Sequence, residues 1–185
     1  ELSKTSISST RLFEILDAQE EQNGENPQRP PMDGDIVFDQ VNFGYNQETG
    51  VLHDVSFTIR AGTTFGILGA TGSGKSTLVA LLDRLYELPR ENGQITIGGV
   101  DIREIDLSYL RKNIGVVLQE PFLFSKTFRE SIADGAPRAD LETVRHYARL
   151  AVIDDAIEHF AQGYETPIGE RGVTISGGQK QRVAI

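Results

Sequence analysis

Residues 69–76 read Gly-Ala-Thr-Gly-Ser-Gly-Lys-Ser and fit the Gly-x-x-x-x-Gly-Lys-Ser/Thr spacing of a phosphate-binding loop. In such a loop, glycines let backbone N–H groups approach an anion at the positive end of a helix dipole. Lys75 adds a flexible positive charge for phosphate oxygens, and Ser76 adds a hydroxyl suited to Mg²⁺. The alternative is a glycine-rich turn that contains a lysine by chance. We predict a nucleotide site formed by Gly69, Ala70, Thr71, Gly72, Ser73, Gly74, Lys75, Ser76 and Thr77.

The elements on either side must position this loop. Residues 64–68, Thr-Phe-Gly-Ile-Leu, are typical of a short buried strand that enters the loop. Residues 77–82, Thr-Leu-Val-Ala-Leu-Leu, are typical of the helix that leaves it. Strand, loop and helix in this order are what phosphate binding requires.

A second motif, Ile-Ser-Gly-Gly-Gln, occupies residues 175–179. Ser176 followed three positions later by Gln179 is also a capping box, so the simpler interpretation is the start of a helix. The two interpretations are compatible, because Gly177 and Gly178 beside a capped helix N-terminus leave bare N–H groups for a terminal phosphate. That phosphate need not be bound by the same chain.

In order and spacing, these motifs resemble the nucleotide-binding domain of ATP-binding cassette (ABC) transporters from about residue 36 to residue 185. The resemblance implies a head-to-tail dimer with a second nucleotide-binding domain, in a homodimer or a heterodimer. ATP is then held between the phosphate loop of one domain and the Ser-Gly-Gly-Gln signature of the other, here Ser176, Gly177, Gly178 and Gln179. Ile175 stands where the family most often has leucine, and an aliphatic replacement of similar volume should be mild.

The resemblance assigns roles to two further residues. Tyr45 corresponds to the aromatic residue that stacks on adenine, and Gln119 to the glutamine whose amide oxygen reaches Mg²⁺ and the attacking water. By residue chemistry alone, Tyr45 could be a core aromatic at a strand end. A glutamine after the apolar run at residues 114–118 could simply be solvated. The residues expected to act in catalysis are Lys75 and Gln119, and the expected magnesium ligands are Ser76 and Gln119.

Three segments are similar to ABC exporters rather than importers. These are residues 119–124 (Gln-Glu-Pro-Phe-Leu-Phe), residues 169–172 (Gly-Glu-Arg-Gly) and residues 9–17, which resemble the continuation of an exporter's last membrane helix. In exporters the second segment touches the coupling helices of the membrane domain. The resemblance therefore implies a transmembrane domain in the same chain and a location at the cytoplasmic face of the cell membrane.

Composition limits the function classes. The 185 residues are 38% hydrophobic and 24% charged, which is typical of one globular core. The net charge of −9 gives little reason to expect nucleic acid as a partner, since phosphate polyanions are bound mainly through lysine and arginine. Cysteine is absent, which excludes disulfides. No run approaches the roughly eighteen apolar residues that a membrane span needs, and no signal peptide is visible.

The expected fold is α/β: a P-loop NTPase core with an antiparallel β subdomain and an α-helical subdomain. We expect a helical tail and mobile linker over residues 1–34, the core over 35–118, the helical subdomain over 119–175 and the signature over 176–185. Strands are predicted at 36–38, 41–43, 55–59, 94–97 and 100–102, and helices at 128–133, 141–148 and 154–160. Residues 98–99 should form a hairpin-like turn, and Asp140 and Asp154 are expected helix caps.

Both ends look cut, and we expect the domain to be C-terminally incomplete. In the family, the next section carries a magnesium-binding aspartate, a catalytic glutamate and a switch histidine. His53, His146 and His159 precede the signature and are expected to be ordinary surface or half-buried residues. This piece alone should therefore bind ATP with negligible hydrolysis, and should expose an apolar edge beside residues 64–68.

Two other functions could use these motifs. A chromosome-maintenance or repair ATPase carries a long coiled coil between the phosphate loop and the signature, and this chain has no heptad run there. A degenerate, noncatalytic half of a heterodimeric transporter remains open, because the decisive glutamate would lie after Ile185.

Overall fold

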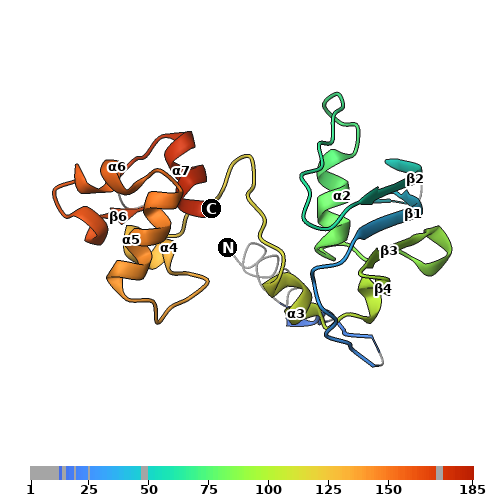
Figure 1. The fold of residues 1–185 in the computed structure, drawn as a ribbon. Helices are drawn as coiled ribbons and strands as arrows, with labels where there is room; N and C mark the ends of the chain where they lie inside the picture. Colours follow the sequence, from blue (N-terminus) through green and yellow to red (C-terminus); the bar gives the residue numbers. More distant parts are fainter. Residues whose placement is uncertain (1–12, 14–15, 19, 25, 47–49, 170–172) are drawn as a thin grey trace, which may run out of the picture. The chain divides into compact units, whose positions relative to one another are not determined.

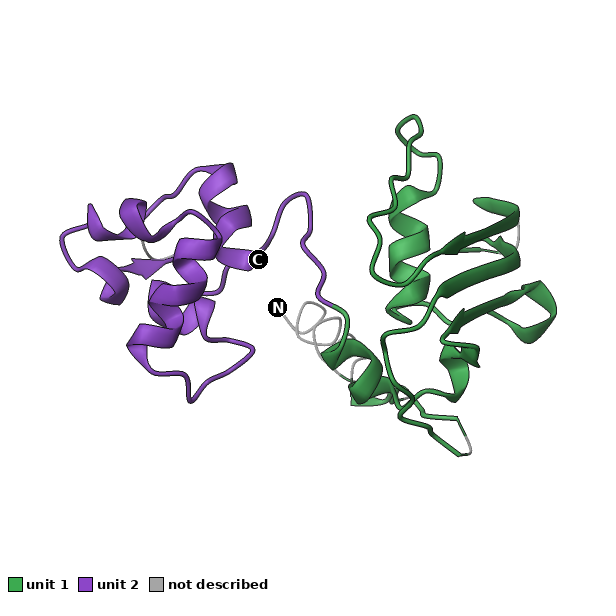
Figure 2. Ribbon diagram, in the orientation of Figure 1, with its two compact units in different colours: residues 1–114 green, residues 115–185 purple. Residues whose placement is uncertain are grey.

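The computed structural model describes residues 13, 16–18, 20–24, 26–46, 50–169 and 173–185. The chain divides into two compact units, residues 1–114 and residues 115–185 (Figure 2). Most of the expected helical tail, and residues 170–172 of the expected exporter segment, lie outside the described residues. None of the described helices is both long and apolar enough to cross a membrane.

The first unit is built on an antiparallel sheet with the strand order β2-β1-β3-β4 (Figure 1). Its strands are β1 (Ile36–Phe43), β2 (Leu52–Ile59), β3 (Gln94–Ile97) and β4 (Val100–Asp101). The tight turn between β3 and β4 places Gly98 and Gly99 at φ 57° and 82°, a conformation that glycine adopts without a Cβ clash. The predicted antiparallel subdomain and its hairpin are confirmed.

A bulge in β1 joins the two strands that the sequence predicted separately. Phe38 and Val41 are three residues apart, so a regular strand would turn them to opposite faces. Between them the pairing register with β2 shifts, and Gln40 takes a positive φ of 48°. Both side chains are consequently buried in the core.

Helices and short turns complete this unit: α2 (Lys75–Leu82), η1 (Arg90–Asn92), η2 (Ile102–Glu104) and α3 (Leu107–Lys112). Leu78 and Leu81 of α2 are buried in one cluster with Phe43 and Leu52 of the sheet. This burial fixes the helix that follows the glycine loop. At about 25 cal/mol per Å² of apolar surface, each leucine contributes on the order of 2 kcal/mol.

The linker before the sheet differs from the mobile hinge that its turn-rich sequence suggested. The backbone N–H of Gln28 donates to the carbonyl of Glu104, and the N–H of Asp106 donates back to the carbonyl of Gln28, at 2.7 and 2.9 Å. The hydroxyl of Tyr109 donates to the carbonyl of Pro30 at 2.9 Å. These bonds tie the described part of the linker to the turn before α3.

The prediction of strands at two apolar runs is wrong. Residues 64–68 and 114–118 have no strand assignment, and neither is paired in a sheet among the described residues. Leu68 is 97% exposed and Leu118 is 59% exposed. A strand needs a neighbour for its N–H and C=O groups, and in the described residues these runs have none. Phe65, Ile67 and Leu68 in the first run are exposed, but without a strand there is no strand edge of the kind expected.

The second unit is mainly helical, as predicted. It contains β5 (Lys126–Thr127), α4 (Phe128–Ile132), α5 (Leu141–Leu150), α6 (Asp154–Glu158), η3 (Gly163–Glu165), β6 (Pro167–Ile168) and α7 (Gly177–Ala184). Asp140 caps α5 by accepting from the N–H of Thr143 at 2.8 Å. Asp154 was expected to cap α6, and this prediction is wrong: the cap position is Ile153, without a side-chain bond.

Candidate functional site

Two glycines of the loop have backbone conformations that other residues rarely adopt. Gly72 and Gly74 take φ values of 82° and 88°, in the left-handed region that favours glycine. Gly74 is also the residue just before α2, and a Cβ there would lie 2.6 Å from Leu52 Cδ2. Glycine at position 74 therefore allows close packing of the loop against β2. The first N–H groups of α2 point toward the loop without helical acceptors, which is the arrangement that binds anions.

Lys75 folds back over this loop. Its Nζ donates to the carbonyls of Gly69 and Ala70 at 2.8 and 2.7 Å, and lies 3.5 Å from Ser73 Oγ. An ammonium group has three donors and no acceptor, so these oxygens hold it at the centre of the loop. A phosphate bound here would compete with these carbonyls for the ammonium group, which has a flexible stem and lies within the loop.

The next two residues of α2 face different surroundings. Ser76 is exposed, so its hydroxyl is available to a ligand. Thr77 is 4% exposed, and its Oγ1 lies 2.9 Å from the hydroxyl of Tyr45. The structure thus brings the predicted adenine-stacking residue into contact with the helix that begins at Lys75.

Tyr45 has aromatic neighbours that sequence reasoning missed. The ring of Tyr86 lies 4.9 Å from the ring of Tyr45 at 78°, and that of Phe43 lies 5.3 Å away at 85°. Edge-to-face pairs of this kind are favourable. Tyr45 nevertheless stays 52% exposed, so it is neither a plain core aromatic nor a free surface side chain. No motif marks Tyr86, and its only signal was an aromatic residue shortly after the α2 segment.

In the second unit, Gln119 is exposed and lies next to α7. Its backbone carbonyl accepts a hydrogen bond from Nε2 of Gln181 at 2.8 Å. Gln181 is a second residue that the sequence did not single out. It connects the backbone of Gln119 to the helix that carries the signature motif.

The signature motif forms the predicted capping box. The N–H of Gln179 donates to Ser176 Oγ at 3.2 Å, and the N–H of Ser176 donates to Gln179 Oε1 at 2.8 Å. Ile175 is buried and anchors the start of the motif in the core of this unit. Gly177 and Gly178 are exposed, and an added Cβ at either would meet no atom within 4 Å. The N-terminus of α7 is therefore open to solvent.

The structure groups the predicted site residues by unit. Tyr45 and residues 69–77 lie in the first unit, whereas Gln119 and residues 176–179 lie in the second.

Among the described residues, no cluster of three or more His, Cys, Asp or Glu side chains could hold a metal ion. His53, His146 and His159 are exposed, as expected. The two predicted magnesium ligands, Ser76 and Gln119, belong to different units.

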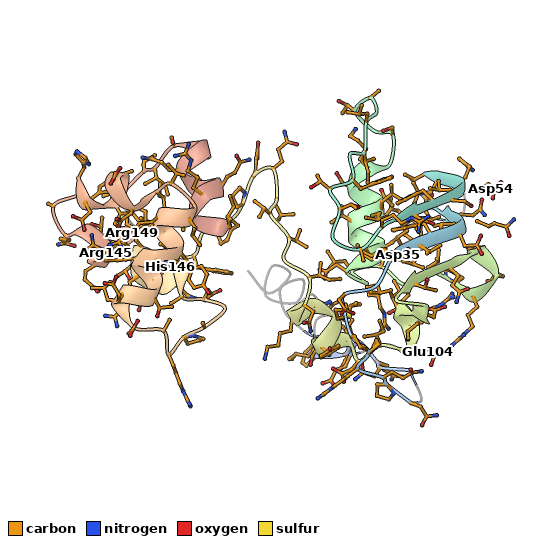
Figure 3. The ribbon with its side chains drawn as sticks, viewed as in Figure 1. Asp35, Asp54, Glu104, Arg145, His146 and Arg149 are labelled. Carbon is orange, nitrogen blue, oxygen red and sulfur yellow. The ribbon has the colours of Figure 1, made fainter. Side chains whose placement is uncertain are left out.

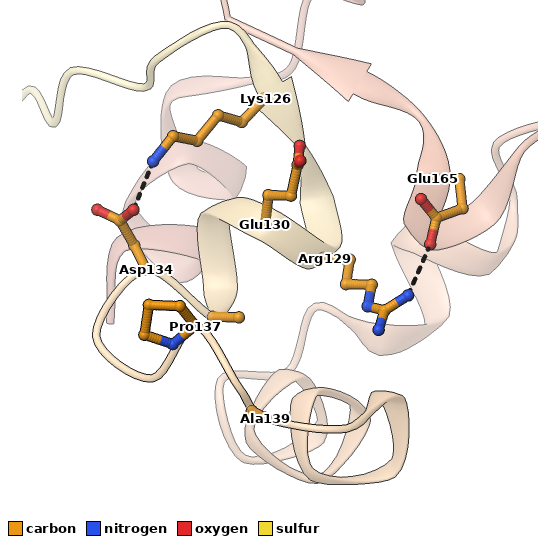
Figure 4. A pocket seen from close by; sticks show the side chains of 8 residues that line it. Lys126, Arg129, Glu130, Asp134, Pro137, Ala139 and Glu165 are labelled. Carbon is orange, nitrogen blue, oxygen red and sulfur yellow. Dashed lines mark hydrogen bonds and ion pairs between the residues drawn. The ribbon is translucent and has the colours of Figure 1, made fainter.

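A separate pocket of about 480 Å³ lies in the second unit beside α4 (Figure 4). Its charged groups are internally paired: Lys126 with Asp134, and Arg129 with Glu165. Hydrogen bonds from the N–H and hydroxyl of Thr127 lower the pKa of Glu130, the remaining charged residue of the lining. This pocket consequently offers no unpaired charge for a phosphate, unlike the glycine loop.

The family model described as "ABC transporter" matches residues 52–185. The exotoxin translocation ATP-binding protein PaxB of Pasteurella aerogenes is 43% identical over 180 residues, which are 97% of this chain and 25% of that protein. The putative multidrug export ATP-binding/permease protein YgaD of Bacillus subtilis (strain 168) is 46% identical over 153 residues, 82% of this chain and 26% of that protein. This chain thus spans about a quarter of the length of these curated relatives.

Among solved structures, a bacterial Atm1-family ABC exporter with ATP bound superposes with a TM-score of 0.86. It is 37% identical in sequence, and the match covers 98% of this chain and 32% of that chain. These matches extend far beyond the glycine loop and include both units. The chain therefore belongs to the ABC transporter family.

Proposed function

We propose that this chain is the ATP-binding domain of an ABC exporter and acts in ATP hydrolysis. The observation that carries the proposal is the position of Lys75. Its ammonium is held by the carbonyls of Gly69 and Ala70 at the open start of α2. That geometry suits a triphosphate, because charge and backbone N–H groups converge on the same point.

Hydrolysis of a terminal phosphate by in-line attack of water depends on positioning and charge neutralisation more than on covalent help from the protein. In this proposal, Lys75 leaves the loop carbonyls to contact phosphate oxygens. Ser76 and Gln119 would supply oxygen atoms to Mg²⁺, which is the donor chemistry that this ion prefers. The bound ion would neutralise charge on the phosphates. Tyr45 would stack on adenine, for which its half-exposed ring is suited.

The signature motif would act on a nucleotide bound by a partner domain, in a homodimer or a heterodimer. Support comes from the N-terminus of α7, where Ser176 and Gln179 satisfy each other while Gly177 and Gly178 leave the helix end accessible. A helix N-terminus without side chains in the way favours an anion. Closure of such a dimer would move a transmembrane domain of the same chain at the cytoplasmic face of a membrane.

The names of the relatives support the export direction. They include an exotoxin translocation protein and a putative multidrug export protein, and the matched solved structure is an exporter with ATP bound.

Titration calorimetry with Mg-ATP tests the phosphate site on the full-length protein. Lys75→Ala should weaken ATP binding about 10- to 100-fold, since a charge-assisted hydrogen bond contributes about 1.5–3 kcal/mol. Lys112→Ala, which removes an exposed lysine at the end of α3, is the matched control and should bind as the wild type does. Equal affinity of the Lys75→Ala variant and the wild type would contradict the proposal.

Crosslinking tests the dimer. Since the 185 residues contain no cysteine, Thr71→Cys and Ser176→Cys each introduce a single thiol into this part of the protein. When the two single variants are mixed, a short bismaleimide should join position 71 of one protomer to position 176 of the other, and only with Mg-ATP. Products joined 71 to 71 or 176 to 176, or a yield independent of nucleotide, would argue against a head-to-tail arrangement.

A further inference from the structure

Tyr45 and Thr77 are connected by a hydrogen bond of 2.9 Å between their hydroxyl oxygens. The two residues lie 32 positions apart, one after β1 and the other in the first turn of α2. Thr77 is almost fully buried, whereas about half of Tyr45 is exposed. The bond therefore attaches a partly exposed ring to a fixed point on the phosphate-loop helix.

Two rings hold Tyr45 from other directions. Tyr86 and Phe43 both contact it at steep interplanar angles of 78° and 85°. A surface tyrosine without such contacts would exchange between rotamers and would lose that freedom when it stacked on a ligand. Here the ring is already oriented while it remains accessible, which is the meaning of preorganisation.

The hydroxyl of Thr77 can serve both ends of a nucleotide. A threonine hydroxyl has one hydrogen to donate and two lone pairs that accept. If Tyr45 donates to Thr77, the hydrogen of Thr77 remains free for an anion bound beside Lys75 and Ser76, which precede it in the same helical turn. A chain of hydrogen bonds of this kind polarises its members, so the binding of one group strengthens the next bond.

We propose that Thr77 and Tyr86 are positioning residues for Tyr45, and that the Thr77–Tyr45 hydrogen bond couples recognition of the base to recognition of the phosphates. The inference rests on the proposed function, because it assumes that Tyr45 contacts adenine and that the glycine loop holds phosphate. It adds that the affinity gained from the base depends on a hydroxyl in the phosphate-loop helix.

The test compares Mg-ATP with inorganic triphosphate, which has no base, by titration calorimetry on the full-length protein. Tyr45→Phe retains the ring and removes only the hydroxyl. It should weaken ATP binding about 3- to 10-fold, as expected for one lost hydrogen bond, and weaken triphosphate binding by a smaller factor, because only the polarisation of the Thr77 hydroxyl is lost there. Tyr109→Phe is the matched control, since it removes a hydroxyl that bonds to the Pro30 carbonyl in the same unit, and it should change neither affinity.

A double-mutant cycle separates coupling from simple loss of contacts. Thr77→Val should also weaken ATP binding, and the Tyr45→Phe/Thr77→Val double variant should be no weaker than Thr77→Val alone. Thr77→Ser, which restores a hydroxyl, should recover most of the affinity. Tyr86→Ala should weaken ATP binding more than triphosphate binding.

Two results would overturn this inference while leaving the proposed function intact. One is wild-type ATP affinity in the Tyr45→Phe variant, and the other is full additivity in the cycle, both with ATP binding that still depends on Lys75. Absence of ATP binding by the wild-type protein would overturn the proposed function and this inference together.

Discussion

The hydroxyl of Tyr164 donates a 2.5 Å hydrogen bond to Asp154, the buried first residue of α6. Nε of Arg149 donates to the other carboxylate oxygen at 3.2 Å, and Nε of Arg145 lies 3.5 Å from the first oxygen. Figure 3 labels both arginines on α5. One carboxylate thus joins α5, α6 and η3, although the sequence predicted for it only a helix cap.

Asp154→Ala should destabilise the second unit strongly. Removal of the carboxylate leaves the buried hydroxyl of Tyr164 without its acceptor and takes one ion-pair partner from Arg149 and from Arg145, which costs on the order of 3 kcal/mol. Asp155→Ala is the matched control, because Asp155 lies in the same first turn but is exposed. Urea unfolding followed by circular dichroism measures both. Similar losses for the two variants would show that Asp154 acts only through the helix dipole.

The contribution of Asp154 should depend on pH. The hydrogen bond from Tyr164, together with Arg149 and Arg145, lowers the pKa of Asp154 below its ordinary value of 3.8, against the opposing effect of burial. A lowered pKa in the folded state stabilises the protein above the unfolded value, and this stability is lost as pH falls through the folded value. The difference in free energy of unfolding between wild type and Asp154→Asn should therefore be constant above about pH 5 and shrink below about pH 4. A difference that stays constant down to pH 2 would contradict this account.

Gly93 should be far less replaceable than Gly99. Gly93 has a φ of 108°, and a Cβ there would lie 2.5 Å from the carbonyl oxygen of Gln40 in the β1 bulge. Gly99 also has a positive φ, 82°, but a Cβ there would meet no atom within 4 Å. The Gly99→Ala substitution introduces only the strain of a positive φ in alanine and should lower the free energy of unfolding by about 1 kcal/mol. The Gly93→Ala substitution adds a clash with the backbone and should lower it by about 3 kcal/mol or more. Thermal unfolding of the two variants measures this difference in stability. An equal loss of stability in both would show that the backbone of the β1 bulge moves to accommodate the added Cβ at position 93.

These residues also show what the sequence could predict. The capping boxes, the Gly98-Gly99 turn and the helices of the second unit depend on residues within a few positions of one another. The sequence predicted all of these except the capping box in which Thr127 and Glu130 begin α4. The backbone of the glycine loop followed from its motif for the same reason. A sequence pattern therefore predicts contacts between residues that are close to one another in the chain.

The failures share the opposite property. Residues 64–68 and 114–118 have strand-like composition, yet a strand exists only with a pairing neighbour, which a local pattern cannot specify. The environment of Asp154 depends on Tyr164, ten residues away, and that of Tyr45 on Thr77 and Tyr86. The candidate site residues could therefore be proposed one by one from the sequence, whereas their contacts could not.

Arg84 should not tolerate lysine. Its buried guanidinium donates to the carbonyls of Ile102 and Ile105 at 3.3 Å and pairs with Glu87 at 2.6 Å. A lysine has one nitrogen and cannot reach these separate acceptors, so buried carbonyls would lose their donors at a cost of about 2 kcal/mol. Arg60→Lys is the control, because Arg60 is mostly exposed. Urea unfolding measures the free energy of unfolding of both variants. The same small decrease in both would show that the hydrogen bonds of the Arg84 guanidinium group do not stabilise the protein.

Ser176 offers a way to separate fold from function in the signature motif. Aspartate and asparagine cap helices about as well as serine does, so Ser176→Asp and Ser176→Asn should both keep α7 intact. Their free energies of unfolding should stay within about 0.5 kcal/mol of the wild type, whereas Ser176→Ala should lose about 1 kcal/mol. Urea unfolding measures this first half of the prediction.

The second half concerns the proposed contact with a partner's nucleotide. The carboxylate of Ser176→Asp would place a negative charge where a triphosphate is expected, and the neutral amide of Ser176→Asn would not. ATP-dependent dimerisation of the full-length protein should therefore be lost in Ser176→Asp and largely retained in Ser176→Asn. Analytical ultracentrifugation with and without Mg-ATP distinguishes them. If the two variants dimerise equally well, no phosphate approaches position 176, and the capping box serves only to begin α7.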